Sequence, residues 1–350
     1  MRNYSNHIIS SVATLKDGLI AINQLTDEIL CLFVVDKTRR LVGTLTDGDI
    51  RRALISEVLL TETIEVAMKK DFIKVLIDKV TPNEVKGYRT KGVTLLPCVD
   101  EDGKIIKVYD LVAMKSVLPI DAVLMAGGKG IRLRPLTETT PKPLLKVGDK
   151  AIIDYNVERL IHYGVENIHV NVNYLAEQIE SHFNREIDGI RIDCVREPRY
   201  LGTMGSVKFI TNFHHEMVLV MNSDLFTNID FEEFYAQHIE QDADISVATI
   251  PYSVSVPYGI LELDEQNIKG LREKPTYNYY ANGGIYLVKR KLFDLIPEDT
   301  FFNATEFIEM LIARDYKVVH FPLIGYWIDI GKPEDYDKAC EIAKHIKSGN

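Results

Sequence analysis

Short apolar runs alternate with segments of helical spacing from residue 121 onward, and this alternation constrains the fold more than any other feature. The runs "DAVLMAGG" (121–128) and "MVLVMNSD" (217–224) are apolar through their middle, which is typical of strands buried on both faces. Between them, "AIIDYNVERLIHYG" (151–164) has helical spacing and ends in glycine. The alternation predicts an α/β fold with a Rossmann-like, mostly parallel sheet and helices on both faces.

Residues 1–117 follow a different pattern, in which one motif occurs twice. "CLFVVDKTRRLVGTLTDGDIRRAL" (31–54) reads as strand, turn, strand and helix, and "TLLPCVDEDGKIIKVYDLVAMK" (94–115) repeats that order, final helix included. Two such halves can bury their apolar faces against each other. Because "SVLPID" (116–121) contains proline and is a plausible linker, we predict domains at 1–117 and 118–350.

Composition limits the partners and the cellular location expected for this protein. The chain has 350 residues and a formal net charge of -10, which argues against general binding to nucleic acid or to acidic membranes. No apolar run reaches the length needed to span a bilayer, and "MRNYSNHIIS" is too polar for a signal peptide. The four cysteines are scattered without a C-x-x-C pair, so we expect reduced thiols and a cytoplasmic protein. The histidines are expected at the surface rather than as ligands.

The stretch "LMAGGKGIRLRPLTETTPKPLLKVG" (124–148) concentrates five cations against the single acid Glu138. Its glycines allow backbone N–H groups to approach a ligand closely, although the spacing matches neither a Walker A loop nor a Rossmann fingerprint. Arg132 offers a planar fork and Lys142 a point charge, and both can neutralise phosphoryl oxygens. Ligands of parallel sheets gather at the carboxyl ends of strands, so we expect "AGGKG" and "NSD" at one edge. The alternative is a glycine turn with solvated charges.

The same stretch carries a recognisable signature. Its pattern G-G-x-G-x-R-L-x-P-L-T-x-x-x-P-K-P-L resembles that of the sugar-1-phosphate nucleotidylyltransferases. The resemblance continues over about 220 residues through "YLGTMGS" (200–206), "MNSDLF" (221–226), "YGILE" (258–262), "EKP" (273–275), "NGGIYLV" (282–288) and "WIDIGKPEDY" (327–336). It implies the nucleotide-diphospho-sugar transferase fold and, together with the front half, a likeness to CBS-fused guanylyltransferases of the mannose-1-phosphate or glucosamine-1-phosphate type, which serve bacterial surface-sugar pathways.

The resemblance also implies a reaction: a sugar-1-phosphate attacks the α-phosphorus of a nucleoside triphosphate, and pyrophosphate leaves. It assigns catalysis to Arg132, Lys142 and Asp224, and Mg²⁺ binding to Asp224 and Asp329. The residues implied for nucleotide binding are Leu124, Ala126, Gly127, Gly128, Glu197, Gly202 and Thr203. Those implied for sugar-phosphate binding are Gly259, Glu273, Lys274 and Asn282.

The base is predicted from Glu197, five residues before Gly202. A carboxylate can accept both donors on the pairing edge of guanine, whereas an amide suits uracil or thymine, so we predict GTP. The alternatives are that Glu197 pairs with Arg196 or Arg199 at the surface, and that the enzyme is a uridylyl-, thymidylyl- or cytidylyltransferase. Tyr200 stands where relatives have proline. A protein of another class, a catalytically silent regulatory subunit, would lack the charged set that is present here.

The front region resembles a tandem CBS regulatory module. Its first half has the typical G-x-x-T-x-x-D ending as Gly43, Thr46 and Asp49, which implies a regulatory adenine-nucleotide site at Thr46 and Asp49. "KVYDL" (107–111) in the second half lacks the threonine. Because tandem CBS halves usually associate with a second pair, we expect a homodimer or a larger homo-oligomer.

Overall fold

The computed structural model describes residues 4–25 and 29–347, and the chain divides into two compact units. The front unit runs to Pro119 and includes the short segments Ile161–Gly164 and Asp188–Ile190. The remainder, from Ile120 onward, forms the second unit. Within the described residues, no helix is both long enough and apolar enough to cross a membrane.

The front unit contains two small sheets of the same topology. In each, the first two strands run parallel, the last two run antiparallel, and the register shifts near the end of the middle strand. One sheet comprises β1 (Ile8–Ser10), β2 (Cys31–Val35) and β3 (Leu41–Thr46), and the other β4 (Val75–Leu76), β5 (Leu95–Val99) and β6 (Ile105–Asp110). The repeat in the sequence is therefore a repeat in strand order. The halves share one cluster of buried side chains: Phe33, Leu41, Leu95, Val99 and Val108.

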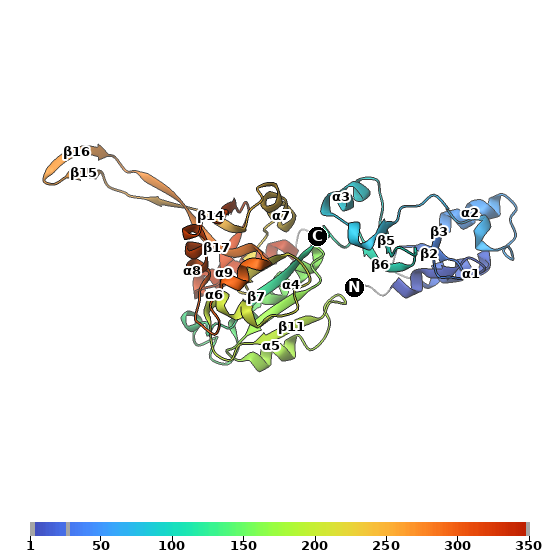
Figure 1. The fold of residues 1–350 in the computed structure, drawn as a ribbon, viewed down its shortest axis with the longest axis horizontal. Coiled ribbons are helices and arrows are strands. Elements are labelled where there is room, and N and C mark those ends of the chain that lie inside the picture. The colour runs from blue at the N-terminus through green and yellow to red at the C-terminus, as the bar shows by residue number, and fades with distance from the viewer. Residues whose placement is uncertain (1–3, 26–28, 348–350) are drawn as a thin grey trace. The chain divides into compact units, whose positions relative to one another are not determined.

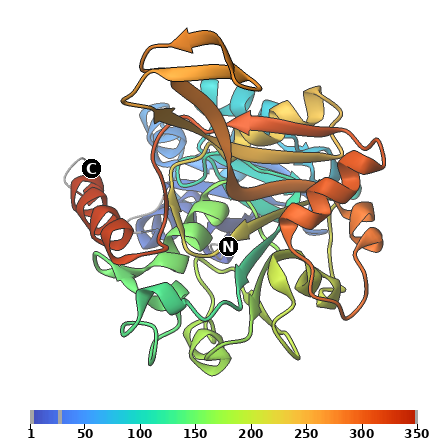
Figure 2. The ribbon, with the colours of Figure 1, turned by 90° about the vertical axis from the view of Figure 1, so that its left-hand side faces the viewer.

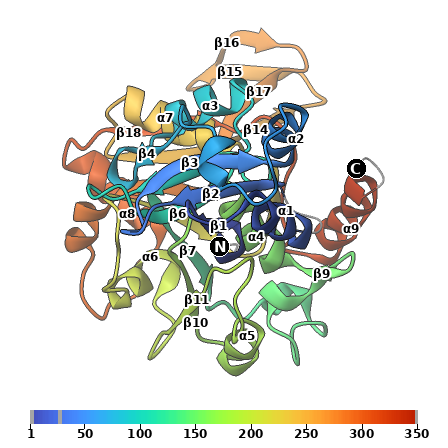
Figure 3. The same ribbon diagram turned by 90° about the vertical axis from the view of Figure 1, so that its right-hand side faces the viewer.

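Three α-helices of the front unit begin at a threonine that forms a capping box with the acid three residues later. These helices are α1 (Leu15–Gln24), α2 (Asp47–Ile55) and α3 (Pro82–Thr90). The threonine hydroxyl accepts from the backbone N–H at the third helical position, and the acid accepts from the threonine N–H, so two otherwise unpaired donors are satisfied. Helices α1 and α2 contact each other in the first half (Figure 3).

The helix predicted after the second repeat is wrong, because residues 111–113 form a turn and no helix follows before β7 (Ile120–Ala126). The Asp110 carboxylate accepts from the backbone N–H groups of Val112 and Ala113, both at 3.0 Å. That short turn replaces the capping box that starts α2 in the first half. The next strand begins at Ile120, directly after Pro119, so little chain is left in which a helix could form.

The second unit is built on a seven-stranded sheet in the order β11-β10-β7-β12-β17-β14-β18. Strand β17 runs antiparallel to both neighbours and every other pair is parallel, so the sheet is mixed rather than uniformly parallel. The strands are β7 (Ile120–Ala126), β10 (Ile168–Val172), β11 (Ile192–Arg196), β12 (Met217–Asn222), β14 (Ile245–Ser255), β17 (Thr276–Lys289) and β18 (Val318–Pro322).

Helices cover both faces of this sheet. Val123, Val218 and Val220 pack with Phe307 and Leu311 of α8 on one face, and the alternate positions of β7 and β12 are equally buried on the other. The helices are α4 (Ile152–His162), α5 (Ala176–His182), α6 (Gly202–Gly205), α7 (Phe231–Glu240), α8 (Ala304–Ala313) and α9 (Pro333–Lys347). Helix α9, red in Figure 2, contacts the short strands β8 (Lys146–Val147) and β19 (Trp327–Asp329). Strand β19 pairs with β13 (Leu225–Thr227), and β8 pairs with β9 (Lys150–Ala151).

Strands β14 and β17 extend past the sheet as a two-stranded ribbon, which carries the hairpin β15 (Ile260–Asp264) and β16 (Asn267–Arg272) at its tip (Figure 1). We call residues 251–282 the arm. No residue of the arm is buried.

Three histidines depart from the surface positions expected for them, whereas His214 and His320 are exposed as expected. His7, His169 and His238 are buried. His215 is partly exposed, and its ring lies 2.8 Å from the buried carboxylate of Asp121. Although burial alone would raise the pKa of Asp121, hydrogen bonds from His215 and Asn167 lower it. These histidines are structural groups of the core and its margin.

We expect His238→Asn to stabilise the second unit at acid pH. His238 is 1% exposed, and burial lowers its pKa to about 4, below the ~6.5 of an unfolded histidine. Between these two pKa values, His238 is protonated in the unfolded chain but neutral in the folded protein. The free energy of unfolding therefore decreases as the pH falls from about 6.5 toward 4. Asparagine can still bond the Ser246 hydroxyl, which lies 2.7 Å from Nδ1, but it does not titrate.

Urea unfolding can be followed by the fluorescence of Trp327, the single tryptophan, which lies in the second unit. Between pH 7 and pH 4 the wild type should lose about 2 to 3 kcal/mol more than His238→Asn. Equal losses in the two proteins would contradict the assignment of this acid sensitivity to His238.

Candidate active site

A cavity of about 740 Å³ opens where β7 and β12 end, at the sheet edge where parallel α/β folds bind ligands. It lies where "AGGKG" and "NSD" were expected to meet. The predicted residues that line it are Ala126, Gly127, Gly128, Arg132, Lys142, Glu197, Gly202, Thr203, Asp224 and Asp329.

The glycine loop after β7 forms one wall of the cavity. Gly130 has a φ of 58°, a left-handed conformation that suits glycine, and its carbonyl accepts from the buried Thr137 hydroxyl at 2.8 Å. At Gly127, an added Cβ would lie 2.6 Å from Oε1 of Glu197. The hydrogen bond from Thr137 fixes the conformation of the loop at Gly130. The absence of a side chain at Gly127 leaves room for the Glu197 carboxylate against the backbone.

Lys142 lies between two carboxylates at the centre of the cavity. It begins the short 3-10 helix Lys142–Leu144, and only 11% of its side chain is exposed. Its ammonium contacts Oδ2 of Asp224 and lies 3.5 Å from Oδ1 of Asp329. The antiparallel pairing of β13 with β19 places Leu225 opposite Asp329, which brings the two acids together from distant parts of the chain.

The environment of Asp224 suits a cation. Burial raises the pKa of its carboxyl above the usual value, the Lys142 ammonium opposes that rise, and Asp329 adds to it. Its Oδ1 is buried without a hydrogen-bond partner. Over residues 4–25 and 29–347 there is no cluster of three or more His, Cys, Asp or Glu side chains placed to hold a metal. Mg²⁺ commonly binds one or two carboxylates together with phosphate oxygens, and this carboxylate pair fits that mode.

Glu197 is buried at the cavity wall, with 3% of its surface exposed. Its Oε2 accepts from the backbone N–H of Leu201 at 2.9 Å, whereas its buried Oε1 has no partner. Burial raises the pKa of Glu197, and the bonds from Leu201 and Ser206 oppose the rise. The alternative of a surface ion pair is wrong, because Arg196 pairs with Glu177 and Glu180, and Arg199 with Asp299.

The segment after Glu197 is held close to the start of α8. Gly202 has a φ of 81°, and a Cβ there would lie 2.7 Å from the carbonyl oxygen of Phe302. The Thr203 hydroxyl accepts from the N–H of Ala304 at 2.9 Å. Tyr200 lines the cavity.

Residues 121–345 match the sequence pattern of the family described as nucleotidyl transferase. The chain belongs to that family. It is 28% identical over 229 residues to the D-glycero-alpha-D-manno-heptose 1-phosphate guanylyltransferase of Aneurinibacillus thermoaerophilus, covering 65% of this chain and 99% of that one. It is 30% identical over 224 residues to the mannose-1-phosphate guanylyltransferase catalytic subunit beta of Drosophila melanogaster, covering 61% of this chain and 60% of the fly protein.

Among solved structures, HddC from Yersinia pseudotuberculosis superposes with a TM-score of 0.52 at 27% identity, covering 64% of this chain and 99% of HddC. The residues that match the family model, 121–345, make up most of the second unit of this nucleotidyl transferase. The chain thus spans the whole of some relatives and under two thirds of others.

Several predicted residues lie outside the cavity of this nucleotidyl transferase. Leu124 is fully buried inside β7, and Gly259, Glu273 and Lys274 are exposed on the arm. Asn282 stands at the arm's base, where its Oδ1 accepts from the N–H of Gly284 and the hydroxyl of Tyr286. In the front unit, Thr46 and Asp49 form the capping box of α2. Leu124, Gly259, Glu273, Lys274 and Asn282 do not line the cavity around Lys142.

Four further residues line the cavity, although the sequence assigned them no individual role: Lys129, Asn222, Ser223 and Gly331. Gly331 belongs to the "WIDIGKP" motif, and a Cβ there would lie 3.2 Å from the guanidinium of Arg132. The glycine two residues after Asp329 was the available signal, because glycine permits a side chain to lie flat against the backbone.

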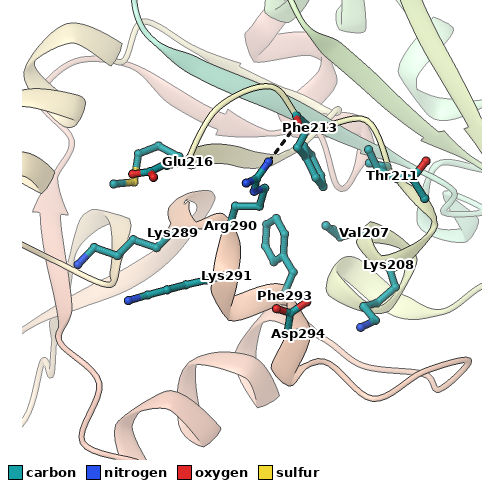
Figure 4. A pocket seen from close by; sticks show the side chains of 12 residues that line it. Val207, Lys208, Thr211, Phe213, Glu216, Lys289, Arg290, Lys291, Phe293 and Asp294 are labelled. Carbon is teal, nitrogen blue, oxygen red and sulfur yellow. Dashed lines mark hydrogen bonds between the residues drawn. The ribbon is translucent and has the colours of Figure 1, made fainter.

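A second cavity, of about 640 Å³, lies at the opposite edge of the sheet, where β12 begins and β17 ends. Lys289 and Lys291 extend to one side of it and Lys208 lies on the other (Figure 4). Lys289 is paired with Asp242 and Asp244. The charged side chains of this second cavity do not converge on one point, in contrast to those around Lys142.

The two adjacent glycines of the loop provide a matched test of the packing. Gly127→Ala should destabilise the second unit by about 1 to 3 kcal/mol, because its Cβ would displace Glu197. At Gly128 a Cβ would meet nothing within 4 Å, so Gly128→Ala should change stability by less than about 0.5 kcal/mol. Unfolding followed by Trp327 fluorescence measures both.

A double mutant checks the cause. In a Glu197→Ala background, the cost of Gly127→Ala should shrink, because the carboxylate that it displaces is gone. If Gly127→Ala destabilises the Glu197→Ala protein as much as the wild type, then Glu197 is not the group that opposes the new side chain. The other neighbour is Asn173, whose Cβ lies 3.3 Å from the same position.

Proposed function

We propose that this chain is a sugar-1-phosphate nucleotidylyltransferase, which transfers a nucleotidyl group from GTP to a hexose- or amino-hexose-1-phosphate and releases pyrophosphate. The observation that carries the proposal is the set of Arg132, Lys142, Asp224 and Asp329 around one cavity beside a glycine loop. Family membership and the guanylyltransferase names of the relatives support the same reaction.

The reaction brings two anions together, so the protein chiefly positions them and neutralises charge. An oxygen of the sugar phosphate forms a bond to the α-phosphorus, and the bond from that phosphorus to the pyrophosphate oxygen breaks. Arg132, on the exposed lip of the cavity, would hold the β- and γ-phosphates and the departing pyrophosphate. Lys142 would stabilise the charge that develops on the α-phosphoryl oxygens. Asp224 and Asp329 would hold Mg²⁺, which supplies further neutralisation of phosphate charge when bound.

The base would be selected by Glu197. The unpartnered Oε1 and its place at the cavity wall suit a carboxylate that accepts the N1–H and the exocyclic amine of guanine. Ala126, Gly127, Gly128, Gly202 and Thr203 would contribute backbone and hydroxyl contacts to the nucleotide. For the sugar phosphate, we assign Lys274 to the phosphate and Gly259, Glu273 and Asn282 to the sugar hydroxyls.

The front unit would act as a tandem CBS module. The same strand order in both halves supports that assignment, and an adenine nucleotide would bind in the first half near Thr46 and Asp49. Association through this unit would give a homodimer or a larger homo-oligomer. The free cysteines are consistent with a reducing compartment, so we place the reaction in the cytoplasm, in the synthesis of surface glycans.

Pyrophosphate release measured over four nucleoside triphosphates and a panel of sugar-1-phosphates tests the function. Turnover that is greatest with GTP and requires Mg²⁺ is the expected result. Turnover that is greatest with UTP, dTTP or CTP would replace the guanylyl assignment. No turnover with any pair, combined with nucleotide binding, would identify a silent regulatory subunit.

Asp224→Asn should lower turnover at least ~10²-fold, because it removes one charge from the carboxylate pair. The matched control is Asp230→Asn. Asp230 caps α7, and asparagine caps helices equally well, so turnover should stay within ~2-fold of wild type. Near-normal turnover in a folded Asp224→Asn protein would remove this residue from the metal site.

Glu197→Gln should lower kcat/KM for GTP about 10- to 100-fold, as expected for a lost charge-assisted bond, and improve UTP or dTTP relative to GTP. Glu180→Gln is the control, since Glu180 sits in a surface ion pair with Arg196. An unchanged preference for GTP in Glu197→Gln would clear Glu197 of base selection.

A further inference from the structure

The arm has two paired parts, a stem and a tip, and apolar cross-strand pairs occur in each. Residues directly opposite each other in a ladder point to the same side. In the stem, Tyr252 pairs with Tyr279 and Val254 with Tyr277, whereas the intervening pair Ser253–Asn278 is polar. In the tip, Leu261 faces Leu271 and Leu263 faces Ile268. The opposite side of the tip carries the ion pairs Arg272–Glu262 and Lys269–Asp264.

Within the second unit, the apolar side chains of the stem and the tip are uncovered. Tyr252 is 59% exposed, Tyr279 56%, Leu261 50%, Leu263 64%, Ile268 63% and Leu271 62%. Isolated two-stranded hairpins are marginal in water, and a patterned apolar face is normally packed against something. With Tyr258, these side chains offer on the order of 800 Å², about what one partner contributes to a stable protein interface.

The arm cannot cover its own cavity without breaking its ladder. Pairing runs without a gap from Thr249–Asn282 to Ser255–Thr276, and the Val256 N–H then donates to the Pro275 carbonyl at 3.0 Å. The ribbon is therefore a continuation of two strands of the central sheet, which fixes its direction. A partner on the apolar side therefore has to come from outside the second unit.

The arm leaves the sheet at the edge where the cavity opens. Strand β17 runs antiparallel to β12, with Met221 opposite Ile285, so the residues before Ile285 extend past the carboxyl end of β12. The carbonyl oxygen of Gly283 accepts from Trp327 Nε1 at 2.9 Å, two residues before Asp329. The base of the arm thus adjoins the site, while Glu273 and Lys274 lie beyond it.

The cavity itself has an exposed apolar rim. Ile131 is 61% exposed, Tyr200 44% and Phe301 50%, and the rings of Tyr200 and Phe301 are 5.9 Å apart. Ile131 and Tyr200 line the cavity. The same chain therefore displays an apolar ribbon and an apolar rim at one edge, which is the complementarity that a two-fold exchange of arms requires.

We propose that two copies exchange arms, so that the apolar face of each arm docks on the cavity rim of the other copy and brings Glu273 and Lys274 to that cavity. Lys274 has a φ of 43°, an uncommon conformation for a residue with a side chain, and such outliers occur at functional sites. The docking surface is independent of the reaction, whereas the role of Lys274 in the partner's cavity rests on the proposed function. Each site is then complete only in the dimer.

Photo-crosslinking of the full chain tests the docking. Benzoylphenylalanine placed at Leu261 should give a product of dimer mass, with its crosslink at residues 131–136, 200 or 301. The control position is Glu262, on the opposite side of the same strand, where dimer product should fall at least ~5-fold. Products of monomer mass only, crosslinks elsewhere, or equal yields from both positions would overturn the arm exchange.

Subunit complementation tests the shared site. Lys274→Ala and Asp224→Asn should each be inactive alone. Co-expressed with different tags and purified as a heterodimer, they should regain about half of the wild-type turnover, because one cavity is intact and receives an intact arm. A heterodimer without activity, no isolable heterodimer, or an active Lys274→Ala protein would overturn the proposal. A wild type without transferase activity would instead refute the proposed function, and the crosslink would still decide the docking.

Discussion

The contact of the Lys142 ammonium with the carboxylates of Asp224 and Asp329 connects three segments that are distant in the chain. The glycine-loop region supplies the cation, the end of β12 supplies one acid, and β19 supplies the other. Two partly buried carboxylates would repel each other without a counter-charge, and removing one partner from such a group is far more costly than the group is stabilising. The geometry of the cavity therefore depends on this contact.

Around Lys142, glycines in the cavity wall allow neighbouring segments to approach each other closely. The glycine at 127 lets Glu197 lie against the loop, and Gly202 lets its segment lie against Phe302. The Glu197 carboxylate is therefore buried, with Oε2 accepting from the Leu201 N–H and Oε1 without a partner. Desolvation makes such a group sensitive to which donors a ligand presents, because an unmatched polar atom is costly there.

The arm follows from the one antiparallel strand in the middle of the sheet. A parallel connection would have returned through a helix, but β14 and β17 run antiparallel and are joined by a ribbon. This topology sends an apolar face into solvent beside the cavity. In the front unit, by contrast, apolar faces are covered within the unit: its two halves have the same strand order and bury one shared cluster between them.

Local patterns in the sequence determined the strands of the front repeat, strands β7 and β12, helices α2 and α4, and the edge of the sheet at which the site lies, because apolar periodicity and glycine chemistry act over a few residues. The same reasoning was wrong for the helix after Asp110, where a side-chain turn and a nearby strand override the repeat. Only the tertiary structure decided that Glu197 is buried, that β13 and β19 bring Asp224 to Asp329, and that Lys274 lies on an arm. Those outcomes depend on pairings between distant segments, and neither the spacing of residues nor their propensities encode which distant strand becomes the neighbour.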